Sequence, residues 1–316
     1  GRMGTSGKLT NDGVASCSIL PRIQDKNVPT MDNCIRARKG ENVRTPGNRI
    51  TEMGNVLEEP CIIHGAALLG LDDLESDITE RFTHATLPLQ ASLDARAVAN
   101  NLVIQDDPDK GIFTPGATKL LLNGPGVIEN KVTRDFPDQD LPYWRGKLQL
   151  QGQMEVMGPE YTWGAVFVLH QSTDFRIYVF KKDPMFADTL ATMINDFERR
   201  IVEEDYWPAK VATDTHLIYR DLQDKECIKD LDPKVEKTIA DYEATKKIIK
   251  DMEAARDELN LLLMTEMGNH VKGQVGEYEI SLPTSTRKPT PTKVVPAYAG
   301  GTFRAKTVRV KRRAAQ

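Results

Sequence analysis

The sequence predicts an α/β fold in which a central mixed sheet is flanked by helices. Three observations predict it: a helical segment comes first, strand patterns follow with one helix between them, and amphipathic helices close the order. Because strands and helices alternate, they are expected to share one core. A hydrophobic content of 40% in 316 residues fits a folded globular protein.

The first half of the predicted core combines one helix with several strands. Clustered apolar residues predict a helix over residues 53–69. Residues 82–103 alternate in polarity, which predicts a strand and its return. Residues 118–122 and 127–132 are predicted strands, and the Asn-Gly-Pro-Gly sequence at 123–126 predicts a turn between them.

The second half is predicted to be richer in helices. A helix is expected over residues 143–157, strands over 164–170 and 175–181, and an amphipathic helix over 184–204. A long helix is expected over 233–267, either docked on its own core or paired with a partner or another subunit. Its apolar residues recur at spacings of three, four or seven, at Val235, Ile239, Tyr242, Ile249, Met252, Leu259 and Leu262.

The chain is predicted to divide into four regions. Residues 1–50 form an N-terminal region of loops and short helices, and 51–205 form the core. Residues 206–282 form a helical region, and 283–316 form a basic tail.

Charge is distributed unevenly along the chain. The net charge is −4, yet residues 281–316 contain nine basic side chains and no acidic one. A basic tail on an acidic body suits a protein whose tail contacts phosphates while its body gathers carboxylates around metal ions. A solvated, flexible C-terminus is the alternative, and composition alone favours it.

The cysteines and hydropathy point to a cytoplasmic protein. The four cysteines form no Cys-x-x-Cys pair, so reduced thiols are expected rather than zinc sites or disulfides. No apolar stretch approaches the roughly 20 residues that cross a bilayer, and no secretory signal is visible, so no membrane association is expected.

The candidate chemistry lies in Asp94 and in the Glu129-Asn130-Lys131 triplet. Side chains two apart on a strand share a face, so Glu129 and Lys131 are expected to point together. Carboxylates from two strands can hold two divalent ions that hydrolyse a phosphodiester, with Lys131 orienting or helping to deprotonate the attacking water. A Glu-x-Lys triplet on a solvated strand is the alternative, and these residues alone leave both open.

Five segments occur in an order that resembles the phage lambda-exonuclease and YqaJ-like viral recombinase family, in the PD-(D/E)XK nuclease superfamily. They include the glutamine-rich helix that begins Leu148-Gln149 and the triplet at Glu129. The resemblance extends over nearly half of the chain, in the segments 54–60, 91–94, 127–131, 148–158 and 174–183. It implies a restriction-endonuclease-like core. The chain departs from the family at Ala95, where glycine is common after the aspartate.

The resemblance also implies roles for individual residues. Asp94 and Glu129 would be ligands of two Mg2+ ions, or of Mn2+ in their place. The carbonyl of Asn130 would complete one site, and Glu58 would face the second ion or its waters. Lys131 would be the catalytic lysine.

Other roles concern DNA. Gln149 would act at the catalytic site, on its waters or the scissile phosphate. Gln151 and Gln153 would contact DNA, unless they simply form a polar helix face. The family holds a terminal 5′ phosphate near its N-terminus, where Ser16 and Arg22 are rough matches. Three arginines of the tail are further DNA-contact candidates, Arg304, Arg309 and Arg312.

The implied activity is a Mg2+-dependent exonuclease that digests linear double-stranded DNA, 5′ to 3′, for recombination by single-strand annealing. Its implied partners are DNA ends, a phage single-strand annealing protein and further copies of itself, as a trimer. Two alternatives remain: a DNA-end-binding or architectural protein that kept the fold, and a single-strand nuclease or endonuclease of the same superfamily.

Overall fold

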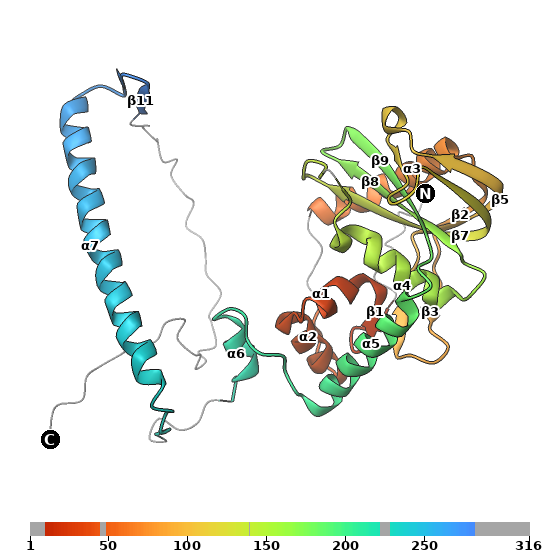
Figure 1. Ribbon diagram of the computed structural model, residues 1–316, viewed down its shortest axis with the longest axis horizontal. Coiled ribbons are helices and arrows are strands. Elements are labelled where there is room, and N and C mark those ends of the chain that lie inside the picture. The colour runs from red at the N-terminus through yellow and green to blue at the C-terminus, as the bar shows by residue number, and fades with distance from the viewer. Residues whose placement is uncertain (1–9, 45–48, 139, 222–227, 282–316) are drawn as a thin grey trace, which may run out of the picture. The chain divides into compact units, whose positions relative to one another are not determined.

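The computed structural model describes residues 10–44, 49–138, 140–221 and 228–281 (Figure 1). The chain forms two units, Gly1–Ile218 and Tyr219–Gln316. The described part of the predicted N-terminal region belongs to the first unit, together with the predicted core. The predicted basic tail lies outside the described residues.

A six-stranded mixed sheet forms the centre of the first unit and confirms the predicted fold class. β7 pairs with β8 and β6 with β9 in parallel, whereas the other neighbours are antiparallel. In spatial order the strands are β2 (Asp72–Ser76), β5 (Ala95–Gln105), β7 (Lys119–Thr133), β8 (Trp163–His170), β9 (Asp174–Lys181) and β6 (Ile112–Phe113). A smaller sheet joins β1 (Ala15–Ser16), β4 (Leu89–Ala91) and β3 (Phe82–Thr83).

Helices cover both faces of the central sheet. Alternate residues of β7 enter different cores: Val127 packs in the cluster that contains Leu150, and Ile128 in the cluster that contains Ile62. Strand side chains alternate between faces, so α3 and α4 lie on opposite faces. The helices of this unit are α1 (Leu20–Gln24), α2 (Val28–Arg38), α3 (Arg49–Leu69), α4 (Leu148–Met157), α5 (Phe186–Glu203) and α6 (Asp214–Ile218). Figure 1 shows α1 and α5 beside α4.

The predicted turn at residues 123–126 is wrong, because β7 runs through it without interruption. The register of β5 against β7 shifts between Ala99 and Leu102, which makes room for one extra residue on β5. Gly124 has a φ of +75°, and Asn101 on the facing strand has a φ of +51°. The residues that resemble a turn therefore lie inside a long strand, opposite a β-bulge of β5.

The predicted helix over 143–157 begins later than expected, at Leu148. Residues Tyr143–Lys147 form an irregular turn in which Gly146 has a φ of +97°. That left-handed conformation is unfavourable for residues with a Cβ and interrupts helical geometry. The residues before α4 therefore turn onto the sheet instead of extending the helix.

The described residues of the second unit form one long helix and a hairpin. α7 (Val235–Met267) has 33 residues and matches the helix predicted over 233–267. β10 (Lys272–Val275) and β11 (Tyr278–Ser281) pair in antiparallel fashion. None of the helices in the described part of the chain is long and apolar enough to cross a membrane.

Candidate active site

Two adjacent strands bring Asp94 beside the Glu129 triplet. Asp94 immediately precedes β5, and the antiparallel register places its neighbour Ala95 opposite Ile128 of β7. The Asn130 backbone N–H donates to Asp94 Oδ2 over 2.8 Å, so the aspartate is fixed against the next strand. The predicted juxtaposition of Asp94 with residues 129–131 is therefore present in the fold.

Glu129 is a buried carboxylate whose two oxygens have different partners. Only 1% of the residue is exposed. Lys131 Nζ donates to Glu129 Oε1, and Gln153 Nε2 donates to Glu129 Oε2 over 2.7 Å. A buried carboxylate needs such partners, because an unpaired charge in the interior is costly.

Helix α4 contributes two glutamines to this site. Gln149 Oε1 accepts a hydrogen bond from Lys131 Nζ over 3.2 Å, and Gln153 binds Glu129 and the Ser92 carbonyl. Residues four apart on a helix share a face, which is why Gln149 and Gln153 both point toward the strands.

The remaining glutamine of α4, Gln151, points away from the site toward the end of β9. Gln151 Nε2 donates to the Lys181 carbonyl, and its Oε1 accepts from the Asp183 N–H, both over 2.9 Å. Gln151 and Gln153 were expected to contact DNA, but 7% and 0% of these residues are exposed. Here Gln151 joins α4 to the end of β9, and Gln153 supports Glu129.

The carboxyl groups of Glu129, Asp94 and Glu58 all interact electrostatically with Lys131. Burial, followed by the charge of Glu129, raises the pKa of both Asp94 and Glu58. Burial alone would lower the pKa of Lys131, but the carboxylates of Glu129, Asp94 and Glu58 outweigh it and raise this pKa. Lys131 is therefore held as a cation, and a bound metal cation would favour the charged form of the carboxyl groups of Asp94 and Glu58.

The oxygen atoms of the site are of the kind that Mg2+ prefers in proteins. Among the described residues, no three His, Cys, Asp or Glu side chains are grouped closely enough to bind one ion. Mg2+ is usually held by one or two carboxylates and retains several waters. Asp94 and Glu129, with the backbone carbonyl of Asn130, would supply ligands of that kind. Glu58, on α3, adds charge from nearby.

The two candidate residues for a DNA end differ in exposure. Ser16 lies on β1 and is buried, with its Oγ 3.0 Å from Ser18 Oγ. Arg22 lies on α1 and is exposed. The neighbouring Cys17 lies in the field of Glu129, since burial and then that carboxylate raise the pKa of its thiol. The N-terminal segment thus packs against the back of the site, with Arg22 at the surface.

A second group of polar residues, which the sequence did not predict, lies two residues further along β7 and β8. Thr133 of β7 is opposite His170 of β8, two residues beyond Lys131 and Val168. His170 Nδ1 lies 3.1 Å from the Asp135 carbonyl, and the buried Arg145 donates to Asp135 Oδ2 over 2.7 Å. Sequence periodicity gives no signal for this group, because the burial of Arg145 depends on the turn before α4.

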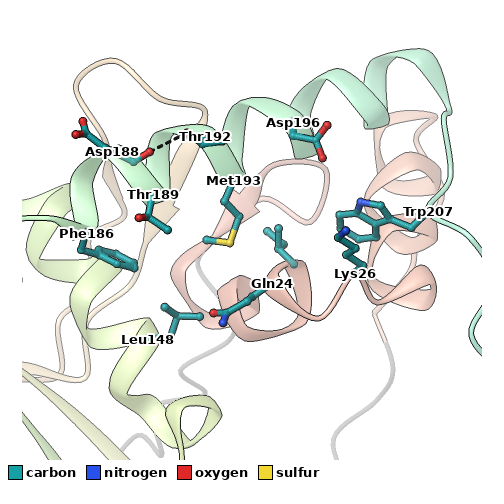
Figure 2. A pocket seen from close by; sticks show the side chains of 11 residues that line it. Gln24, Lys26, Leu148, Phe186, Asp188, Thr189, Thr192, Met193, Asp196 and Trp207 are labelled. Carbon is teal, nitrogen blue, oxygen red and sulfur yellow. Dashed lines mark hydrogen bonds between the residues drawn. The ribbon is translucent and has the colours of Figure 1, made fainter.

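A pocket of about 810 Å³ lies away from these residues, between α1, α5 and the start of α4. Figure 2 shows Leu148, Phe186 and Met193 on its apolar side, with Trp207 at the other end. None of the residues Asp94, Glu129 and Lys131 lines it. The candidate chemistry therefore belongs to the sheet and α4, not to this pocket.

No protein-family model matches the chain, and no curated protein matches it. Among solved structures, the alkaline exonuclease LHK-Exo from Laribacter hongkongensis is 15% identical, with a TM-score of 0.43 over 61% of this chain and 90% of its own. The structure of LHK-Exo in complex with dAMP is also 15% identical, with a TM-score of 0.44 over 62% of this chain and 91% of its own. A phage-related exonuclease from Haemophilus somnus is 15% identical, with a TM-score of 0.38 over 60% and 96%. All three TM-scores are below 0.5, so the function has to be inferred from the site itself.

Proposed function

We propose that this chain is a metal-dependent deoxyribonuclease, an exonuclease of the lambda-exonuclease and YqaJ-like kind that digests linear double-stranded DNA. One observation carries the proposal. Asp94, directly before β5, lies beside Glu129 of the adjacent β7, and Lys131 donates to both Glu129 and Gln149. Two carboxylates, one lysine and a fixed amide are suited to phosphodiester hydrolysis.

The side chains of the site would have different roles in hydrolysis. Asp94, Glu129 and the Asn130 carbonyl would hold two Mg2+ ions, or Mn2+, with Glu58 facing the second ion. Bound Mg2+ would supply charge neutralisation at the phosphate and at the departing oxygen. Lys131, kept as a cation by its carboxylate neighbours, would orient the attacking water or an oxygen of the scissile phosphate. Gln149 accepts a hydrogen bond from Lys131 and would help to hold its ammonium group in place.

The direction and biological setting are finer parts of the proposal. Digestion from the 5′ end, action beside a phage single-strand annealing protein and assembly of several copies are supported by the motif order in the sequence. The basic residues of the C-terminal tail support sequence-independent DNA affinity, because contacts to phosphates supply most of it.

The proposal is tested with a linear duplex labelled at one 5′ end or one 3′ end, and with the same duplex closed into a circle. We expect nucleotide release from the linear form in Mg2+, none in EDTA and none from the circle. Glu129→Gln should abolish release. Glu155→Gln is the matched control, since Glu155 pairs with Lys182 at the other end of α4.

Each other result has a definite meaning. Cleavage of the circle would identify an endonuclease of the same superfamily. Tight binding to DNA ends without release in any metal would identify an end-binding protein. Release that persists in EDTA or in Glu129→Gln would contradict the proposed site.

A further inference from the structure

Helix α7 presents an apolar stripe that is left exposed by the described residues of its own unit, 219–221 and 228–281. Ile248, Met252 and Leu259 expose 62%, 67% and 62% of their surface, and Leu262 exposes 66%. At 100° per residue these side chains, with Ile249 and Leu263, fall on one face of the helix. Exposed apolar surface of this extent marks an interaction site.

Charge is asymmetric along the same helix. The N-terminal half, including its cap, has five lysines and three acids, and the C-terminal half has five acids and one arginine. The lysines are Lys234, Lys237, Lys246, Lys247 and Lys250, and the later acids are Asp251, Glu253, Asp257, Glu258 and Glu266. A helix of this kind is complementary to a second copy of itself that runs in the opposite direction.

We propose that α7 pairs with α7 of a second copy of this chain as an antiparallel coiled coil. Written as heptads with Ile249 at position a, the stripe places Met252 at d. Antiparallel pairing then packs Ile249 of one copy on Met252 of the other, and Tyr242 on Leu259. Every such contact occurs twice, because the pair is symmetric about its centre.

The flanking positions fit the same register. Lys246 of one copy faces Glu253 of the other, twice, while Ile248 faces Ala255. Parallel pairing would instead stack Arg256 on Arg256 and Glu266 on Glu266 within the apolar seam. Like charges there are unfavourable, so the antiparallel direction is selected. The inference concerns assembly and does not depend on the proposed nuclease activity.

The first test measures the mass of the full-length protein in solution by light scattering after size exclusion. We expect a dimer, or a multiple of it, at micromolar concentration. Lys246→Glu should weaken the dimer about tenfold or more, since it creates two repulsive pairs. Lys246→Glu combined with Glu253→Lys should restore it. Lys247→Glu is the matched control, because Lys247 lies on the opposite face of α7.

The second test is directional and uses disulfide cross-linking in a Cys227→Ser background. A mixture of the Tyr242→Cys and Leu259→Cys proteins should form cross-linked heterodimers, whereas Tyr242→Cys alone should not. A monomer at all concentrations would overturn the proposal. So would an assembly, such as a trimer, that is indifferent to Lys246→Glu, or efficient cross-linking of Tyr242→Cys to itself.

Discussion

Gln153 Nε2 on α4 donates to Glu129 Oε2 on β7 over 2.7 Å, and this bond connects the helix to the carboxylate at the centre of the site. The same amide nitrogen lies 3.1 Å from the Ser92 carbonyl, two residues before Asp94. One side chain therefore contacts Glu129 on β7 and the segment that leads to Asp94, and it binds the carboxylate oxygen of Glu129 that Lys131 does not.

Removing this bond should affect activity and stability together. Gln153→Met keeps the volume but leaves Glu129 short of one donor, so we expect unfolding to become easier by about 1–3 kcal/mol. We also expect activity to fall about 10–100-fold, as for other residues that orient a metal ligand. Chemical denaturation and nucleotide release measure the two effects.

Gln151→Met is the control for that experiment. Gln151 is also buried and also binds the backbone, but it contacts Lys181 and Asp183 rather than the site. The Gln151→Met protein should be less stable but should keep its activity per folded molecule. If both variants lose activity equally, Gln153 does not act through Glu129.

Stability without metal should fall as pH rises above the ordinary carboxyl range of about 4. The pKa values of Asp94 and Glu58 are raised in the folded chain, by burial first and by Glu129 second. The folded state then binds more protons than the unfolded state, so its advantage is complete at low pH and is lost as pH rises through the raised values. Thermal melting in EDTA from pH 4 to 8 measures this trend.

Added Mg2+ should raise the melting temperature, and the increment should grow with pH over the same range. Metal binds the deprotonated carboxylates of the folded chain, so binding and deprotonation reinforce one another. Asp94→Asn should lose most of the increment, while Asp174→Asn at the surface should keep it. An increment that is equal at every pH would rule out these carboxylates as the ligands.

Gly152 on α4 allows the N-terminal segment to pack behind the site. A Cβ there would lie 2.4 Å from Leu20 Cδ1 and 3.2 Å from Cys17 Sγ. Gly152→Ala should therefore destabilise the protein by about 1–3 kcal/mol, as overpacking does. Gly54→Ala, in α3 with nothing within 4 Å, should instead stabilise it by about 0.5–1 kcal/mol. Two changes of the same sign would contradict the described packing.

The ion pair of Arg145 with Asp135 should matter more than its surface counterpart. The Arg145 side chain is 7% exposed, so Asp135→Ala leaves a buried guanidinium without its carboxylate partner. We expect denaturation experiments to show a clear loss of stability, because the buried cation then has no counter-charge. Asp174→Ala removes the partner of the more exposed Arg176 and should cost about 1 kcal/mol or less. Equal losses would show that burial does not distinguish the two pairs.

The meeting of Asp94 with the Glu129 triplet follows from the sequence because it depends on local rules. Strand alternation places Glu129 and Lys131 on one face, and an antiparallel neighbour brings in Asp94. Helical periodicity likewise separates Gln151 from Gln149 and Gln153. The interior position of Gln153 was missed, because its burial depends on which face of α4 meets the sheet.

Long-range pairing explains the remaining differences. The Asn-Gly-Pro-Gly sequence is a turn by local preference, yet pairing with β5 carries β7 straight through it. The start of α4 depends on the left-handed Gly146, which packs against Val166 of β8 and Glu129 of β7. Neither interaction leaves a periodic pattern in the sequence, so neither could be predicted from it.

The most direct test of the proposed site is the rate of nucleotide release from a linear duplex in saturating Mg2+, compared between Lys131→Met and Lys182→Met. Both lysines are largely covered and bind a carboxylate, but only Lys131 contacts Glu129 and Gln149. We predict that Lys131→Met lowers the rate by about 10²–10⁴-fold while folding and DNA binding persist, and that Lys182→Met remains near wild type. Release by Lys131→Met at the wild-type rate would contradict the assignment of this site.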